Sequence, residues 1–233
     1  MSVEMETEDA GLGGGEMKLV LLGPPAAGKG TQAGFLSREL QVPHVSTGEI
    51  IREEIRRETA LGKSAKEGIG RGQLLSDGIV CEMVGSWLEG RPTESGFIFD
   101  GFPRSVPQAE TLEQMLADLG EALDAVLFIN ARRDVIESRV LGRLWCQSCR
   151  MIFNTSRDSL ELSDPCPVDG GPLSRRDDDT LEILAERLRE YEKVTAPLVS
   201  YYKKSDLLRE IDGNRSPEAV FAEITSKLAT VAS

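Results

Sequence analysis

The stretch GPPAAGKGT, residues 23–31, decides the fold of this chain. It follows the apolar run MKLVLL, which does not alternate with polar residues and so predicts a short strand buried on both faces. A helix is predicted to follow over residues 28–40. A glycine-rich turn between a strand and a helix is the setting of a phosphate-binding loop, because backbone N–H groups and the helix N-terminus surround the anion. We therefore expect Lys29 to reach the β- and γ-phosphates of a nucleotide.

One position departs from the commonest form of this loop. A serine or threonine usually follows the lysine, and its hydroxyl binds magnesium. Here Gly30 stands before Thr31. A GTPase or motor ATPase normally keeps that hydroxyl in place, so the departure weakens the interpretation of the chain as a nucleotide switch. The alternative interpretation of the loop is a glycine-rich turn that only joins a strand to a helix.

Short apolar runs recur along the chain and predict further buried strands, at residues 44–46, 96–100, 124–130 and 207–211. Helical segments are expected between and after them, at residues 48–58, 62–71, 77–89, 106–119, 132–141 and 179–204 and from residue 216. Strands that alternate with helices predict an α/β fold with a doubly wound, parallel five-stranded sheet flanked by helices. Residues 142–175 break this rhythm and predict an inserted subdomain of turns and short hairpins.

Charge and composition narrow the classes of function. The net charge is −12 and the isoelectric point about 4.7, which argues against a general nucleic-acid binder. No apolar run approaches the ~18–20 residues that span a bilayer. Residues 1–16 are acidic and glycine-rich and lack the pattern of a signal peptide, so we expect a disordered extension on a cytoplasmic protein without membrane or nucleic-acid partners. Arginines near residues 139–143 and 175–187 favour a small anionic ligand.

The segment GFIFDGFPRSVPQ, residues 96–108, carries a second set of candidate groups. Asp100 ends a predicted strand, which places its carboxylate at the carboxyl edge of the sheet, where it can orient a magnesium-bound water. Arg104 offers a planar fork for phosphate, and the amide of Gln108 can pair with a base edge. Taken singly, Asp100 could be a helix cap and Gln108 a surface residue.

Three of the four cysteines lie in the predicted insertion. Cys146-x-x-Cys149 and Cys166-x-x-Asp169 form two knuckles whose spacing suits tetrahedral zinc, which accepts carboxylate oxygen beside thiolate sulfur. Three alternatives stay open: free cysteines, a disulfide, or another ligand such as Asp164.

Five motifs in this order resemble those of the adenylate kinase family: GPPAAGKGTQ (23–32), STGEIIR (46–52), GQLLSD (72–77), DGFPRSVPQ (100–108) and RDDD (176–179). The similarity runs from about residue 17 to the carboxyl terminus and is closest to the long-lid form with a zinc-binding lid. It implies a core of residues 17–45, 76–141 and 177–233, a helical AMP-binding segment 46–75 and a zinc lid 142–176. Ala26, where the family usually has glycine, and the extra acidic Asp177 are departures.

The resemblance also implies the reaction and the site. We expect reversible, magnesium-dependent transfer of the terminal phosphoryl group of ATP to AMP, giving two ADP, by a monomer whose lid closes to exclude water. ATP-binding is assigned to Ala26, Ala27, Gly28, Lys29, Gly30, Thr31, Arg139, Arg143, Ile152, Phe153 and Arg215. AMP-binding is assigned to Thr47, Arg52, Gln73, Leu74, Leu75, Gly101, Phe102, Pro103, Arg104, Gln108, Arg176 and Arg187. The catalytic set is Lys29, Arg104, Arg139, Arg143, Arg176 and Arg187, with Asp100 holding magnesium through water.

Three other functions compete with this one. A kinase for UMP, CMP or GMP would share most of the motifs, although the long lid and the STG motif at residues 46–48 favour AMP. A phosphate-loop switch would need a guanine-reading NKxD motif, which the chain lacks. A zinc-ribbon module that binds nucleic acid or protein fits poorly with the acidic balance and leaves residues 100–108 unexplained.

Overall fold

The computed structural model describes residues 16–59, 62–63, 76–92, 95–149 and 151–231. Its main sheet has five strands: β1 (Lys18–Leu22), β2 (His44–Ser46), β3 (Phe97–Asp100), β4 (Ala125–Asn130) and β8 (Leu208–Asp212). They lie in the order β2-β3-β1-β4-β8, and every neighbouring pair is parallel. The predicted doubly wound parallel sheet is therefore confirmed.

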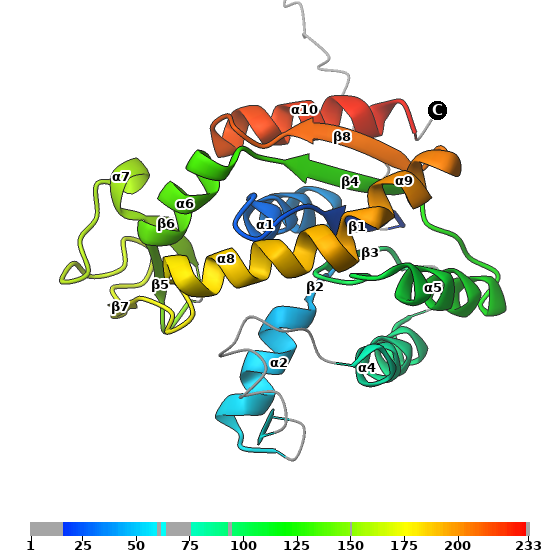
Figure 1. The fold of residues 1–233 in the computed structure, drawn as a ribbon, viewed down its shortest axis with the longest axis horizontal. Coiled ribbons are helices and arrows are strands. Elements are labelled where there is room, and N and C mark those ends of the chain that lie inside the picture. Colours follow the sequence, from blue (N-terminus) through cyan, green and yellow to red (C-terminus); the bar gives the residue numbers. More distant parts are fainter. Residues whose placement is uncertain (1–15, 60–61, 64–75, 93–94, 150, 232–233) are drawn as a thin grey trace, which may run out of the picture.

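Helices cover both faces of the sheet (Figure 1). Leu19 and Leu21 of β1 pack into one apolar cluster with residues of α1 (Lys29–Leu40), α6 (Arg133–Leu141) and α10 (Pro217–Ala229). Val20 and Leu22 pack into a second cluster with residues of α4 (Asp77–Gly90), α5 (Val106–Asp118) and α9 (Pro197–Lys204). Burial on both faces explains why the strand sequence is apolar without alternation.

The register of the sheet brings the carboxyl ends of the strands together. Asp100 at the end of β3 lies opposite Leu21 of β1 and Ser46 of β2, and α2 (Thr47–Arg56) follows directly after β2. Asn130 at the end of β4 lies opposite Asp212 of β8. The loop that follows β1 thus lies at the carboxyl edge of the parallel strands, the edge at which open α/β sheets bind ligands.

The predicted insertion forms a second, smaller sheet. β5 (Arg143–Cys146) pairs antiparallel with both β6 (Ile152–Asn154) and β7 (Leu173–Ser174), and the short helix α7 (Thr155–Asp158) follows β6. Its core is small and consists of the buried residues Leu144, Cys146, Phe153, Cys166 and Leu173. We call this unit the lid; it extends from one side of the main sheet (Figure 1).

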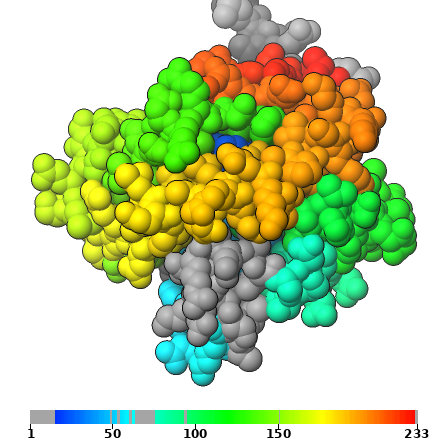
Figure 2. Space-filling view, viewed as in Figure 1, coloured from blue at the N-terminus to red at the C-terminus, as the bar shows by residue number. Residues whose placement is uncertain are grey.

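The prediction of one helix over residues 179–204 is wrong. α8 (Leu181–Glu190) begins after Thr180, whose side chain accepts a hydrogen bond from the N–H of Ile183 (3.2 Å). A wider turn, η1 (Tyr191–Thr195), follows, and the N–H of Ala196 bonds to the carbonyl of Tyr191 five residues back. Pro197, which has no N–H to donate, starts α9. Figure 2 shows α8 exposed along this face between the lid and the core.

Some predictions fall on residues whose placement is not described. These are the acidic extension up to residue 15, most of the helix expected at 62–71, and the AMP-binding candidates Gln73, Leu74 and Leu75. Within the described part of the chain, no helix is both long enough and apolar enough to cross a membrane.

Candidate active site

The phosphate loop has the backbone geometry that its glycines predict. A Cβ at Gly23 would lie 2.2 Å from the carbonyl oxygen of Ile129, and Gly28 has a φ of +108°, so both positions favour glycine. Ala26 adopts a left-handed φ of 58°. Glycine, the more usual residue at this position, would adopt that φ without strain. Nζ of Lys29 donates to the carbonyls of Gly23 (2.7 Å) and Pro24 (2.9 Å), so the ammonium group lies within the loop.

The charges of Lys29 and Asp100 shift each other's pKa within the site. Burial lowers the pKa of Lys29 to about 8, although the negative charge of Asp100 opposes the shift. Burial alone would raise the pKa of Asp100, but a hydrogen bond from His44 and the charges of Lys29 and Arg104 lower it. Asp100 is therefore a carboxylate that can hold a hydrated cation.

Two neighbours of Asp100 clarify the sequence. A Cβ at Gly30 would lie 3.3 Å from Oδ2 of Asp100, so glycine after Lys29 leaves room for this carboxylate. Nε2 of His44 lies 3.5 Å from the same oxygen. His44 was not predicted as a site residue. The available signal was the position of His44 on β2, the strand next to β3, which ends at Asp100. The register pairs His44 with Ile98.

A single open cleft of about 1780 Å³ gathers the predicted cations. It is lined by Lys29, Arg52, Arg104, Arg139, Arg143, Arg176, Arg187 and Arg215. The phosphate-loop residues Ala26, Ala27, Gly28, Gly30 and Thr31 and the lid residues Ile152 and Phe153 also line it. In a chain of net charge −12, a cleft with this many cations suits a polyanion of small size.

Two of these arginines pair with the acidic residues of the RDDD motif. Nη1 of Arg143 lies 3.1 Å from Oδ1 of Asp179, and Nη2 of Arg187 lies 3.0 Å from Oδ2 of Asp178. Burial lowers the pKa of Arg143 and raises that of Asp179. The acidic pair therefore orients one arginine from the start of the lid and one from α8 toward the same cleft.

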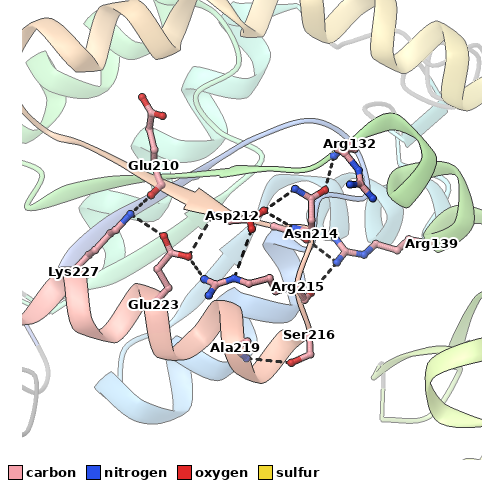
Figure 3. A network of polar contacts seen from close by, with 11 residues as sticks. Arg132, Arg139, Glu210, Asp212, Asn214, Arg215, Ser216, Ala219, Glu223 and Lys227 are labelled. Carbon is pink, nitrogen blue, oxygen red and sulfur yellow. Dashed lines mark hydrogen bonds and ion pairs between the residues drawn. The ribbon is translucent and has the colours of Figure 1, made fainter.

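Arg139 connects the phosphate loop to the loop after β8. Its Nη1 donates to the carbonyl of Ala27 (2.9 Å), and its Nη2 donates to the carbonyl of Gly213 (2.7 Å). Nη2 also donates to the carbonyl of Arg215 (3.3 Å), as Figure 3 shows. Arg139 and Arg143 were both expected to act on phosphate. In this structure their surroundings differ, because Arg139 is bound by backbone carbonyls and Arg143 by a carboxylate.

A network of side chains fixes residues 212–216, which we call the β8–α10 loop (Figure 3). Oδ1 of Asn214 accepts from the N–H of Arg132 (2.8 Å), and Nδ2 of Asn214 donates to Oδ1 of Asp212 (2.6 Å). The carboxylate of Glu223 accepts from Arg215 and from Nζ of Lys227 (2.8 Å). Of the residues in Figure 3, Arg139 and Arg215 were predicted as site residues, and no motif marks the others.

The turn after β3 is held by hydrogen bonds to one carbonyl. Oγ1 of Thr47 (3.0 Å) and Nε of Arg104 (2.7 Å) both donate to the oxygen of Gly101. Burial and the charge of Arg187 lower the pKa of Arg104 to about 10. Pro103 lines the cleft, but the side chain of Phe102 lies in the core against Phe99, with ring centroids 6.0 Å apart.

Gln108 lies apart from the surface of the cleft. Its side chain is buried, with 2% of the residue exposed. Oε1 accepts from the N–H of Arg104 (2.7 Å), and Nε2 donates to Oδ1 of Asp77 (2.7 Å). The amide is therefore next to the predicted phosphate-binding arginine and already oriented by two partners.

The lid brings the four predicted metal ligands together. One ligand atom from each of Cys146, Cys149, Cys166 and Asp169 lies within 4.8 Å of the others. Backbone N–H groups of residues 148 and 149 point at Sγ of Cys146, as at a thiolate. The N–H of Gly171 donates to Oδ1 of Asp169 (2.9 Å) and lowers the pKa of that carboxyl. Three sulfurs and one carboxylate match the donor set of structural zinc.

The geometry also bears on two alternatives for the cysteines. Sγ of Cys149 and Sγ of Cys166 are 3.6 Å apart, well beyond the ~2.05 Å of a disulfide, and all four cysteines are free. Oδ2 of Asp164 accepts from the N–H of Glu161 (2.7 Å), so the carboxylate in the cluster is that of Asp169.

Comparisons with known proteins identify the family to which the chain is similar. A family model described as "Adenylate kinase" matches residues 21–207. An adenylate kinase of Carboxydothermus hydrogenoformans is 42% identical over 212 residues, covering 91% of this chain and 99% of that protein. One from Caldanaerobacter subterraneus subsp. tengcongensis is 42% identical, with coverages of 91% and 96%. One from Methanocella arvoryzae is 40% identical over 216 residues, with coverages of 93% and 100%.

Proposed function

The chain belongs to the adenylate kinase family, and we propose that the cleft described above is where it transfers the terminal phosphoryl group of ATP to AMP. The reaction gives two ADP and is reversible. The observation that carries the assignment is the convergence of the phosphate loop, Asp100 and arginines from separate segments of the chain on one cleft. A phosphate-loop switch is not favoured, because that function needs neither these arginines nor the acceptor turn after β3.

The phosphate loop and Asp100 would hold the donor side. Magnesium bound with ATP would neutralise negative charge on the phosphates, and the carboxylate of Asp100 would hold a water of the ion. Lys29 would exchange the carbonyls of Gly23 and Pro24 for phosphate oxygens, which are stronger acceptors for an ammonium group. Ile152 and Phe153 of the lid and the backbone at Arg215 would lie near the adenine.

The arginines would stabilise the charge that develops on the transferred group. Phosphoryl transfer needs alignment and positive charge more than covalent help, and one well-placed arginine can contribute ~10³–10⁵ in rate. Arg143 and Arg187 are paired with Asp179 and Asp178, so phosphate would compete with these carboxylates for the guanidinium groups. Arg104 and Arg176 would complete the set, and Arg139, whose guanidinium is bound by three backbone carbonyls, would support it mainly by bracing the donor side.

AMP would bind between the turn after β3 and α2. Arg104, Arg52 and Arg187 line the cleft and would bind the phosphate of AMP, while Gln108 would read its base. Thr47 and the segment from Gly101 to Pro103 would shape the pocket. Gln73, Leu74 and Leu75 belong to the same proposal but fall outside the described residues.

We assign the lid a structural zinc ion held by Cys146, Cys149, Cys166 and Asp169. The ion would stiffen a unit whose own core contains five buried residues, and it would take no part in the chemistry. Closure of the lid over both nucleotides would exclude water, a smaller acceptor than AMP. The enzyme would act as a cytoplasmic monomer without nucleic-acid partners.

The deciding experiment offers Mg-ATP with AMP, GMP, CMP or UMP and measures diphosphates and free phosphate. We expect ADP from ATP plus AMP, little product from the other three acceptors and little free phosphate. Product with another monophosphate instead would move the assignment to that kinase. Free phosphate released equally with every acceptor would contradict phosphoryl transfer to AMP.

A further inference from the structure

Among the described residues, the side-chain amide of Gln108 has two partners with fixed roles. Oε1 accepts from the backbone N–H of Arg104 (2.7 Å), and Nε2 donates to Oδ1 of Asp77 (2.7 Å). A backbone N–H can only donate, and a carboxylate can only accept. Rotation of the amide by 180° would therefore place an oxygen against the carboxylate and an N–H against an N–H, and both hydrogen bonds would be lost.

Asp77 is itself held in place. Its Oδ2 accepts from the hydroxyl of Ser105 (2.7 Å), and the same hydroxyl oxygen accepts from the N–H of Gln108 (3.3 Å). Asp77 is the first residue of α4, and Ser105 caps α5, the helix that carries Gln108; the two helices pack side by side (Figure 1). The orientation of the amide is thus fixed before any nucleotide binds.

The groups that remain on the amide have a definite chemistry. One N–H of Nε2 and one lone pair of Oε1 are left after these two bonds. An adenine edge offers an amino donor at position 6 beside a ring-nitrogen acceptor, which matches an amide in a single orientation. A 6-oxopurine such as guanine or hypoxanthine presents an oxygen at position 6, which would face the amide oxygen.

We propose that Asp77 is a positioning residue that, with the N–H of Arg104, locks the amide of Gln108 and so selects adenine over 6-oxopurines in the acceptor. This inference rests on the proposed function, in which Gln108 reads the base of AMP. Because Gln108 is buried here, the base reaches the amide only when covering side chains move aside. The amide it then meets has already been oriented.

The test compares AMP with inosine monophosphate, which carries oxygen at position 6, as acceptors for Mg-ATP. Asp77→Ala should lower kcat/KM for AMP about tenfold and the AMP-to-inosine-monophosphate ratio by a similar factor, with the KM for ATP unchanged. Asp118→Ala is the matched control, because Asp118 accepts from the amide of Gln114 (2.7 Å) on the exposed side of the same helix α5. Asp118→Ala should change neither kcat/KM for AMP nor the AMP-to-inosine-monophosphate ratio.

A double-mutant cycle shows whether Asp77 acts through Gln108. If it does, Asp77→Ala in a Gln108→Ala background changes the acceptor ratio no further. If Asp77 had a merely structural role, Asp77→Ala would lower kcat/KM equally for both acceptors or raise the KM for ATP. Either result would overturn the inference. Melting temperatures, measured in parallel, separate lost folding from lost selectivity.

The inference and the proposed function fail differently. If wild-type protein makes no ADP from ATP and AMP, the proposed function is wrong. If it does, and Gln108→Ala narrows the acceptor ratio while Asp77→Ala leaves it intact, only the positioning role is overturned. If Gln108→Ala leaves the ratio intact, base reading by Gln108 and the role of Asp77 are overturned, while phosphoryl transfer stands.

Discussion

Lys29 is bound in this structure by two carbonyls of its own loop, and burial lowers its pKa to about 8. Phosphate favours the ammonium form, so binding of ATP should raise that pKa. Below pH 8 the free enzyme already carries the charge. Above pH 8 it must take up a proton to bind, and the affinity for a non-hydrolysable Mg-ATP analogue should fall by up to about tenfold per pH unit.

Titration calorimetry between pH 7 and 9, in buffers of different ionisation enthalpy, measures both the affinity and the proton uptake. Lys29→Arg is the matched control, since a guanidinium stays charged over this range and should remove the pH dependence even where binding is weaker. An affinity for the analogue that is flat with pH in the wild type would contradict the prediction.

Arg139 should act on the donor side mainly as a brace. Its guanidinium joins the carbonyl of Ala27 to those of Gly213 and Arg215. Hydrogen bonds from a charged donor contribute about 1.5–3 kcal/mol each, so Arg139→Ala should raise the KM for ATP at least tenfold and lower the melting temperature. The KM for AMP should change little.

Steady-state kinetics with each nucleotide varied in turn check this prediction. Arg133→Ala is the control on the same helix α6, where the side chain of Arg133 is exposed and pairs with Glu137 (2.8 Å). A collapse of kcat with the KM for ATP unchanged would instead show that Arg139 contacts the phosphoryl group in the transition state.

At the scale of elements, the five strands of the main sheet and most of its helices could be predicted, because each follows from local pattern. The apolar runs can be recognised in the sequence without knowing which strands they pair with. The alternation of strands with helices then indicated the fold class. The turn at Tyr191–Thr195 was missed because a helical period carries no mark of a local change from four-residue to five-residue hydrogen bonding. Pro197 was the available signal for the interruption.

The candidate site divides in the same way. The phosphate loop and the turn after β3 could be predicted because their residues are contiguous. The partners Asp178 and Asp179 of the arginines, and the contact of Asn214 with Arg132, join segments that only the fold brings together; the latter pair is 82 residues apart. Such contacts leave no spacing pattern in one sequence.

The lid is the element that should depend on a metal. Its five-residue core is too small to stabilise it alone, and zinc contributes an apparent ~10–16 kcal/mol to folding in small zinc domains. Cys146→Ser should lower zinc content and the temperature at which the lid unfolds, with the phosphate loop intact. Elemental analysis and scanning calorimetry measure both quantities.

Cys81→Ser is the matched control for this substitution. Cys81 lies on α4 outside the ligand cluster, so its loss should leave zinc content unchanged. If Cys146→Ser changes neither the zinc content nor the unfolding temperature of the lid, the zinc assignment is wrong.

At the scale of the whole molecule, the proposed reaction makes two demands on the cleft. The cleft, of about 1780 Å³, would hold two nucleotides, and transfer to AMP requires that water be excluded from it. In the proposed mechanism Arg143 and Arg187 also leave Asp179 and Asp178 for phosphate, and these four residues belong to the start of the lid, α8 and the segment that joins them. Closure of the lid is the motion that would meet both requirements.

We therefore expect the radius of gyration to fall when the enzyme binds a compound in which five phosphates join two adenosines, because it fills the donor and acceptor sides at once. Small-angle X-ray scattering measures this change in solution. AMP alone is the control. It fills only the acceptor side and provides no donor phosphate for the lid to bind, so the radius of gyration should decrease less. If the compound binds and the radius stays constant, the open cleft is itself the reactive state, and exclusion of water must come from the nucleotides rather than from the lid.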